Sequence, residues 1–304
     1  MVWSSRRLHI VTGKGGVGKS TVTAALALAA QREKKRVLVC EVTAKERVAS
    51  LLGAPDCGPE VKRIDESIWS VHVRPAEAMR EYALMVVRFR AIYNAVFENR
   101  LVRYFLRAVP SLPEIVELGK VWWHVVKEQD EEGKPRWDAV ILDAPATGHG
   151  ISFLRTPRTI LELVSEGPMV RDMKRMQAML TDPALTAIHV VTMPEEMPVN
   201  EAVDLHQAIV EMQLPEGRLF LNHHFERRFS ADERQTLAST DDGALGPSRL
   251  AARYWGERQD LSAHYEARLR REIELPMTLI PYLAAKEFGR AAVERIAEIV
   301  GREG

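Results

Sequence analysis

Residues 13–20 read Gly-Lys-Gly-Gly-Val-Gly-Lys-Ser and stand between an apolar run at residues 8–12 and a helix-compatible stretch at residues 19–32. The glycines allow consecutive backbone N–H groups to turn towards one anion, and the positive end of the following helix points at the same anion. Lys19 would supply a charge to nucleotide phosphates, and Ser20 a hydroxyl to Mg²⁺. The pattern predicts a phosphate-binding loop between a strand and a helix, formed by Gly13, Gly15, Gly16, Val17, Gly18, Lys19, Ser20 and Thr21.

The composition narrows the class of protein. The chain has 304 residues, with 42 Lys+Arg against 42 Asp+Glu, 46% hydrophobic residues and 28% charged residues. These values are typical of a folded globular protein, and the balanced charge argues against a dedicated nucleic-acid binder. No uncharged apolar run approaches the roughly 18 residues that a membrane-spanning helix needs. We expect a cytoplasmic protein without an integral membrane segment.

Short apolar runs alternate with helical stretches along the chain. The helical stretches lie at residues 19–32, 196–212 and 286–300. The apolar runs are mostly apolar on both faces, as in a parallel sheet covered by helices, and predict strands at residues 8–12, 36–42, 68–73, 137–142, 187–192, 217–222 and 277–281. The alternation predicts an α/β fold with a doubly wound, mostly parallel sheet.

Part of the chain contains more helix than this sheet requires. The strands predicted at 68–73 and 137–142 are separated by far more than the dozen or so residues of an ordinary crossover. We interpret residues of about 75–135 and 157–185 as helical insertions within a single domain that spans residues 1–304. Residues 230–248 are polar and contain Asp241-Asp242-Gly243, so they predict a loop or lid.

A second phosphate element follows the strand predicted at 137–142. Asp143 comes directly after this strand, where a carboxylate in a parallel sheet is placed to hold Mg²⁺ or its water. The sequence therefore predicts a metal site formed by Ser20 and Asp143. Gly148 would let the backbone respond to the terminal phosphate. His149 is either a sensor of that phosphate or a loop histidine with a local hydrogen bond.

The end of the strand at 217–222 carries a candidate base reader. Guanine recognition usually relies on Asn-Lys-X-Asp after a strand, but residues 222–225 read Asn-His-His-Phe and lack the carboxylate. Asn222 can still form two hydrogen bonds with the N6/N7 edge of adenine. We therefore predict that the bound nucleotide is ATP.

Two further motifs carry a family resemblance. A second lysine, Lys14, precedes Gly15-Gly16, and residues 143–149 read Asp-Ala-Pro-Ala-Thr-Gly-His, followed by Phe-Leu at 153–154 and by Pro157. With these motifs the chain resembles the deviant Walker A P-loop ATPases of the SIMIBI class, and among them the bacterial branch of the ArsA-like and tail-anchored-protein-targeting ATPases. The resemblance implies that Lys14 reaches across a dimer interface to the partner's nucleotide, and that Lys14, Lys19 and Asp143 serve catalysis. It also implies that Pro281 and Leu283 complete the adenine pocket.

The same resemblance implies a function. The protein would be a Mg²⁺-dependent, nucleotide-switched ATPase, a homodimer or a heterodimer with a paralogue, that handles or targets a hydrophobic protein client. One alternative is a motor or regulatory subunit of a membrane efflux or transport complex, although the three cysteines of a metalloid site are not all present. Another is an ATP-binding pseudo-switch with weak hydrolysis that pairs with a paralogue. Met169, Met173, Met176 and Met179 share one helical face and form either part of a client groove or core.

One motif departs from the resembled family. Its second strand is followed by Asp-Pro-Ala-His or a close variant, whose aspartate positions the attacking water, whereas residues 41–47 read Glu-Val-Thr-Ala-Lys-Glu-Arg. Thr43 takes the place of the aspartate, and a hydroxyl does not accept a proton as a carboxylate does near neutral pH. Glu41 and Glu46 are out of register, and we interpret them as a solvated helix start. The sequence therefore predicts slow hydrolysis.

Overall fold

A computed structural model describes residues 5–86, 111–239, 246–285 and 287–302. The strands are β1 (Leu8–Gly13), β2 (Val37–Glu41), β3 (Lys62–Asp65), β4 (Ile68–His72), β5 (Ala139–Ala146), β6 (Thr186–Thr192), β7 (Glu216–His224) and β8 (Met277–Pro281). They form one sheet in the order β3-β4-β2-β5-β1-β6-β7-β8, in which β3 and β4 are antiparallel and the other neighbours are parallel. This confirms the predicted α/β fold with a doubly wound, mostly parallel sheet.

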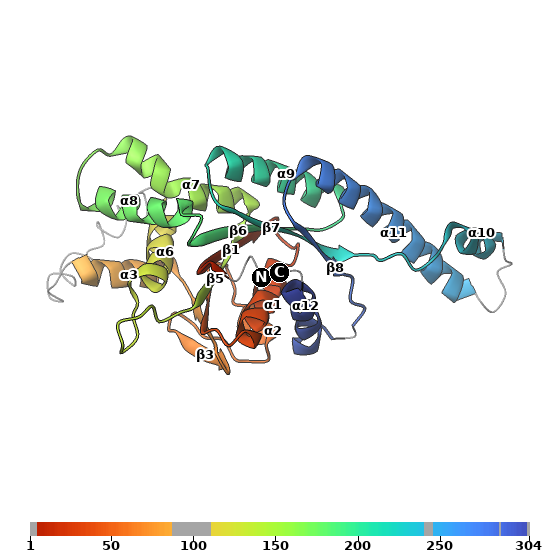
Figure 1. The fold of residues 1–304 in the computed structure, drawn as a ribbon, viewed down its shortest axis with the longest axis horizontal. Coiled ribbons are helices and arrows are strands. Elements are labelled where there is room, and N and C mark those ends of the chain that lie inside the picture. The colour runs from red at the N-terminus through yellow and green to blue at the C-terminus, as the bar shows by residue number, and fades with distance from the viewer. Residues whose placement is uncertain (1–4, 87–110, 240–245, 286, 303–304) are drawn as a thin grey trace.

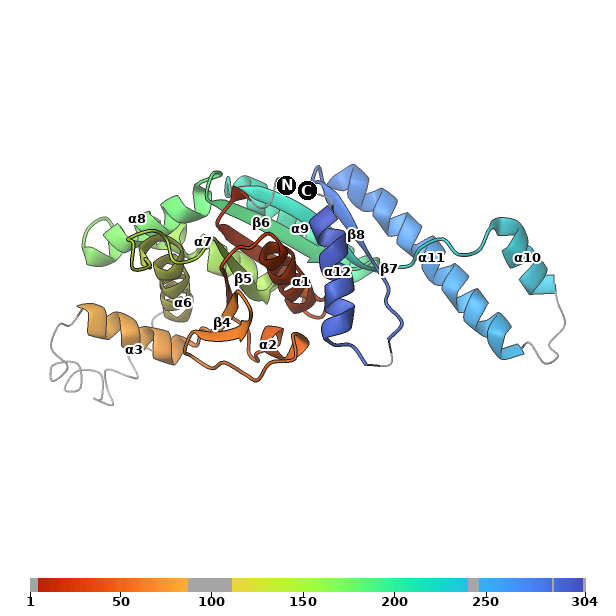
Figure 2. The ribbon, with the colours of Figure 1, turned by 60° about the horizontal axis from the view of Figure 1, so that its bottom comes forward.

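Helices cover both faces of this sheet (Figure 1). They are α1 (Lys19–Arg32), α2 (Val48–Leu51), α3 (Pro75–Val86), α6 (Leu112–Trp122), the π-helix η2 (Trp123–Lys127), α7 (Thr147–Leu163), α8 (Pro168–Thr181), α9 (Glu196–Glu211), α10 (Ala231–Ser239), α11 (Gly246–Glu272) and α12 (Arg290–Arg302). α1, α2 and α12 lie on one face, and α7, α9 and α11 on the other. α3, α6 and α8 gather at one end of the molecule, and α10 lies at the opposite end (Figures 1 and 2).

The alternation of side chains along the strands explains the two layers of helices. In β5, Val140 and Leu142 face the core that α7 and α9 cover, whereas Ile141 faces the core that α1 and α12 cover. In β1, Ile10 and Val11 divide between the two cores in the same way. Because successive residues of a strand point to opposite faces, a run that is apolar at every position requires helices on both sides.

The strand order fixes where a ligand can bind. β1 lies between β5 and β6, and the chain leaves β1 towards β2 on one side and reaches β6 on the other. In open α/β sheets, ligands bind at the carboxyl ends of the strands where the order reverses. The parallel register pairs Val11 with Asp143 and Gly13 with Ala146, so the glycine-rich loop and Asp143 emerge side by side at this edge.

Three stretches differ from the expectations. Residues 231–239 and 246–248 are helical, and the polar sequence concealed a capping box in which the Ser230 N–H donates to Glu233 Oε2 (2.7 Å) and the Glu233 N–H to Ser230 Oγ (3.2 Å). α7 begins at Thr147, ten residues before Pro157, and its first turn packs so closely that a Cβ at Gly150 would lie 3.0 Å from Thr12 Oγ1. The charged strand β3 was not expected, because it pairs only at the sheet edge. Lys286, the expected start of the last helix, lies outside the described residues.

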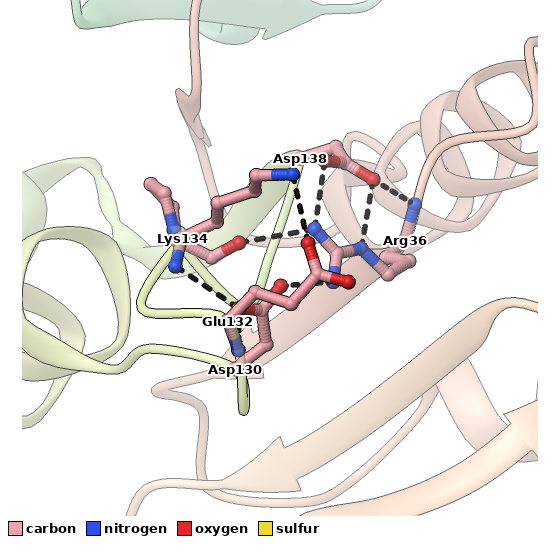
Figure 3. Close-up of polar contacts among 6 residues, drawn as sticks. Arg36, Asp130, Glu132, Lys134 and Asp138 are labelled. Carbon is pink, nitrogen blue, oxygen red and sulfur yellow. Dashed lines mark hydrogen bonds and ion pairs between the residues drawn. The ribbon is translucent and has the colours of Figure 1, made fainter.

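An arginine fastens the segment before β5 to the start of β2 (Figure 3). The backbone N–H and Nε of Arg36 donate to Asp138 Oδ2 (2.8 and 3.1 Å), and a terminal nitrogen donates to Asp130 Oδ2 (3.0 Å). Another terminal nitrogen donates to the carbonyl of Pro135 (3.0 Å). These bonds close the loop at the amino ends of β2 and β5, so both strands deliver their carboxyl ends in a fixed register.

Candidate nucleotide-binding site

Glycine is required at two positions of the loop between β1 and α1. Gly13 has φ +148°, and a Cβ there would collide with the carbonyl oxygen of Val191 in β6. Gly18 has φ +94°, and a Cβ there would collide with the side-chain amide of Asn222 in β7. Residues that carry a side chain rarely adopt such positive φ values, so only glycine lets the loop pass this close to both strands. The two glycines therefore hold the loop against β6 and β7 at the start of α1.

Lys19 lies over this loop. Its Nζ donates to the carbonyl oxygens of Gly13 and Lys14, both at 3.1 Å, and the side chain is buried. Burial lowers the pKa of Lys19, and the charges of Asp143 and Glu201 oppose this shift. These carbonyl contacts hold the ammonium where the phosphates of a nucleotide would reach it.

Ser20 and Asp143 form the second part of the site. Ser20 Oγ donates to Asp143 Oδ2 at 2.6 Å, and Asp143 is fully buried. It lies within β5, which continues to Ala146, and not directly after the strand as predicted. Burial raises the pKa of Asp143 to about 7, and the hydrogen bond from Ser20 opposes the increase. Asp143 Oδ1 is buried without a hydrogen bond to any described residue. A hydroxyl and a carboxylate with a spare oxygen are ligands that suit Mg²⁺, so these residues fit the predicted metal.

The predicted base reader is connected directly to the loop. Asn222 is buried, its Nδ2 donates to the carbonyl of Val17 (2.9 Å), and its Oδ1 accepts from the N–H of His223 (2.9 Å). After these two contacts, one N–H and one lone pair of the side-chain amide remain for a ligand. Pro281 ends β8 opposite His224, and Leu283 packs against the core beneath α1. The structure therefore brings Asn222 to the phosphate loop and places Pro281 and Leu283 at the neighbouring strand end.

The residues after β2 are engaged in local contacts. Thr43 Oγ1 donates to the carbonyl of Lys45 at 2.8 Å. Glu41 accepts from the N–H groups of Arg47 (2.7 Å) and Val48 (3.2 Å), and Glu46 accepts from those of Cys57 (2.5 Å) and Gly58 (2.8 Å).

Both glutamates are therefore buried backbone caps, and their interpretation as a solvated helix start is wrong. The side chain of Glu46 is 4% exposed, and Glu41 is fully buried. Burial raises the pKa of Glu41, against the effect of its two backbone hydrogen bonds. No pattern in the sequence indicated this role, since the backbone N–H groups that bind Glu46 come from a turn eleven and twelve residues further on.

Lys14 has a partner that the sequence did not reveal. Its Nζ forms an ion pair with Oε1 of Glu201, in the second turn of α9. The hydrogen bond from Lys14 lowers the pKa of Glu201. A helix that begins at the carboxyl edge of the sheet presents its first turns to the phosphate loop, and this position was the available signal. His149 is exposed at the start of α7.

Comparison with known proteins agrees with this geometry. Residues 6–167 match the model of the ArsA family, described as an anion-transporting ATPase. ATPase BagA of Mycobacterium tuberculosis (strain ATCC 25618 / H37Rv) is 30% identical over 259 residues, which cover 82% of this chain and 75% of the relative. ATPase GET3 of Kluyveromyces lactis is 22% identical over 254 residues, which cover 72% of each chain.

The structure adds one finding on membranes. Among the helices that it describes, none is both long and apolar enough to cross a bilayer. The family match covers more than half of the chain and includes the glycine-rich loop, Lys14 and Asp143. The chain therefore belongs to the ArsA family of ATPases.

Proposed function

We propose that the protein is a Mg²⁺-dependent ATP switch whose site is the loop at 13–20 together with Asp143. One observation carries this proposal: Ser20 and Asp143 are hydrogen-bonded at 2.6 Å, and the second oxygen of this buried carboxylate has no described partner. Mg²⁺ bound to both residues would neutralise phosphate charge. Lys19 would then exchange its two carbonyl contacts for phosphate oxygens.

ATP is the proposed nucleotide. Asn222 retains an N–H and a lone pair, which match the N6/N7 edge of adenine. The residue that would have to carry a carboxylate for guanine is Phe225, which is buried in stacking contact with Tyr282, their ring centroids 4.6 Å apart. We expect ATP to bind more than about tenfold more tightly than GTP, because loss of a matched hydrogen-bonding pair costs about 1–3 kcal/mol.

Titration calorimetry tests the site. Lys19→Ala removes the ammonium that faces the phosphates, and we expect no measurable Mg-ATP binding by this variant. Lys134→Ala, at an exposed lysine in the loop before β5, is the matched control and should bind like the wild type. Unchanged ATP affinity in Lys19→Ala would refute the site, and equal ATP and GTP affinities would refute the role of Asn222.

Hydrolysis by the isolated chain is proposed to be slow. In residues 41–47, both carboxylates accept backbone N–H groups, and Thr43 donates its hydroxyl to a carbonyl. A base that positions water contributes about 10²–10⁴-fold to a rate, and neither glutamate is free to act as one without breaking its caps. The same observation supports the alternative of a pseudo-switch that pairs with a paralogue.

Dimerisation is part of the proposal. Lys14 lies at the carboxyl edge of the sheet with its side chain 28% exposed. Exposed apolar side chains follow two strands at this edge, namely Met197 after β6, and Tyr282 and Phe288 after β8. An apolar fringe beside a charged nucleotide site suits an interface that forms around the nucleotide.

The proposed partner of the switch is a hydrophobic protein client. Large apolar side chains are exposed at the end of the molecule formed by α3, α6 and α8, among them Trp123 and Val126 in η2, Leu163 at the end of α7 and Met169 in α8. The alternative of an efflux motor is consistent with the family description, but Cys40 and Cys57 are both buried, and burial raises the pKa of each thiol. Co-purified apolar helices, rather than a membrane transporter, are the expected companions of the ATP-bound protein.

A further inference from the structure

Lys14 is held by its own chain. Its Nζ is paired with Oε1 of Glu201, and the two side chains are 28% and 31% exposed, so the pair lies at the rim of the phosphate loop. Glu201 belongs to α9, whose first turns follow β6, and β6 borders β1. The contact therefore joins the phosphate loop to helix α9 of the same subunit.

The pair places a carboxylate where negative charge is otherwise brought by a nucleotide. The hydrogen bond from Lys14 lowers the pKa of Glu201, and the charge of Lys19 adds to this effect, so Glu201 stays ionised through the neutral range. Both lysines of the loop thus interact with one anionic side chain. A phosphate and Glu201 would compete for the same ammonium group, since one ammonium donates few strong hydrogen bonds at a time.

We propose that Glu201 is a positioning residue that retains Lys14 in its own subunit until the partner's nucleotide displaces it. The inference rests on the proposed ATP-dependent dimer, in which Lys14 serves the other subunit. In the nucleotide-free monomer, the pair keeps Lys14 folded against α9. When two ATP-bound subunits meet, each Lys14 leaves Glu201 and contacts the partner's phosphates. The exchange sets a threshold that opposes dimerisation without ATP.

The size of this threshold follows from the exposure of the pair. A partly exposed ion pair shifts an equilibrium by about 1.7- to fivefold. A symmetric dimer breaks two such pairs, so removing both carboxylates should strengthen ATP-dependent dimerisation by roughly 3- to 25-fold.

Two variants of α9 isolate the effect. Glu201→Gln keeps the shape of the side chain and removes its charge. Glu211→Gln makes the same change at the far end of α9, where Glu211 is exposed and has no ion pair with any described residue. Thermal unfolding of both variants checks that neither change disturbs the fold.

The first measurement tests the pair without any nucleotide. Trace acetylation of the ATP-free protein, read by mass spectrometry, gives the reactivity of Lys14 relative to the exposed Lys45. We expect Lys14 to react about two- to fivefold faster in Glu201→Gln than in the wild type or Glu211→Gln, because its amine is no longer tied to a carboxylate. Equal reactivity in all three proteins would overturn the inference, whatever the oligomeric state.

The second measurement tests the competition. Sedimentation equilibrium with Mg-ATP should give a dissociation constant for the dimer that is roughly 3- to 25-fold lower in Glu201→Gln, with no change in Glu211→Gln. The gain should vanish in the double variant Lys14→Ala/Glu201→Gln. Equal or weaker dimerisation of Glu201→Gln would overturn the competition, and weaker dimerisation would place Glu201 in the interface. A wild type that binds ATP and stays monomeric would refute the proposed dimer instead. In that case the acetylation assay would still show the faster reaction of Lys14 in Glu201→Gln.

Discussion

Burial and metal binding favour opposite protonation states of the Asp143 side chain. It is fully buried, and burial raises its pKa from the ordinary 3.8 to about 7, yet Mg²⁺ requires the ionised form. In the proposed site, the proton and Mg²⁺ would therefore compete for this carboxylate near neutral pH. This competition would give the site a pH dependence that an exposed aspartate would lack.

We expect the apparent affinity of the nucleotide complex for Mg²⁺ to fall about tenfold from pH 8 to pH 6, because the ionised fraction of a group with this pKa falls by that factor. Nucleotide phosphates also take up protons in this range, so the informative quantity is the difference between the wild type and Asp143→Asn. Magnesium titrations at both pH values measure it. The same pH slope in Asp143→Asn would show that another group is responsible.

The stability of the nucleotide-free chain should respond to the same group with a definite sign. The folded-state pKa of Asp143 is raised, so its contribution to stability is complete below about pH 4 and is lost as the pH rises to about 7. Asp143→Asn should therefore gain stability relative to the wild type between pH 5 and pH 8. Urea unfolding at the two pH values checks this, and a constant difference would contradict the assigned burial.

Thr43 is the residue that we expect to limit the hydrolysis rate. The wild type should hydrolyse fewer than about one ATP per minute, against about 1–1,000 per second for typical enzymes. Thr43→Asp restores a carboxylate and should raise the rate at least about tenfold, whereas Thr43→Ala should change it little. A phosphate-release assay compares the three proteins. Fast wild-type turnover that Glu41→Gln or Glu46→Gln abolishes would show that a capping glutamate is the base.

At the scale of elements, the packing of α8 shows whether its methionines form part of a client groove or part of the core. Met173, Met176 and Met179 are at most 3% exposed, whereas Met169 is 40% exposed. A Cβ at Gly119 of α6 would lie only 3.0 Å from Met176 Cε, so α6 and α8 pack tightly here. Three of the four methionines therefore belong to the core, and α8 offers only its first turn to a client.

Two truncations on α8 test this packing. Met176→Ala should lower the free energy of unfolding by about 2–5 kcal/mol, because it leaves a cavity between α6 and α8. Met169→Ala should change it by less than about 0.5 kcal/mol, as expected for an exposed position. Chemical unfolding of both variants gives the comparison. A larger effect at Met169 would show that the exposed end of the stripe carries the packing.

The elements differ in how well the sequence anticipated them. In buried strands such as β5, residues 139–142 are apolar at every position, and the loop at 13–20 needs glycine where φ is positive, so both leave strong patterns. α10 and β3 are polar and lie at the surface, where hydrophobic periodicity carries no signal. The contacts of Glu41, Glu46 and Glu201 join residues from 6 to 187 positions apart, which only the folded chain brings together.

At the scale of the whole molecule, the sheet separates two kinds of surface. The proposed nucleotide site lies at the carboxyl edge, with Lys14 and the apolar side chains Met197 and Phe288. The α7–α8 turn lies at one end of the molecule (Figure 2), and the two helices carry exposed Leu163 and Met169 beside it. α7 begins at Thr147, directly after β5 and four residues after Asp143, and runs to that end, so it links the two surfaces.

The mass of the protein in solution tests the nucleotide-switched dimer most directly. Sedimentation equilibrium of the wild type should show dimer formation with Mg-ATP and mostly monomer with ADP or without nucleotide. Lys14→Ala should bind ATP by calorimetry and form the dimer more weakly, because the lysine no longer reaches the partner's phosphates. A wild type that binds ATP and remains a monomer at all concentrations, alone and with candidate paralogues, would contradict the account.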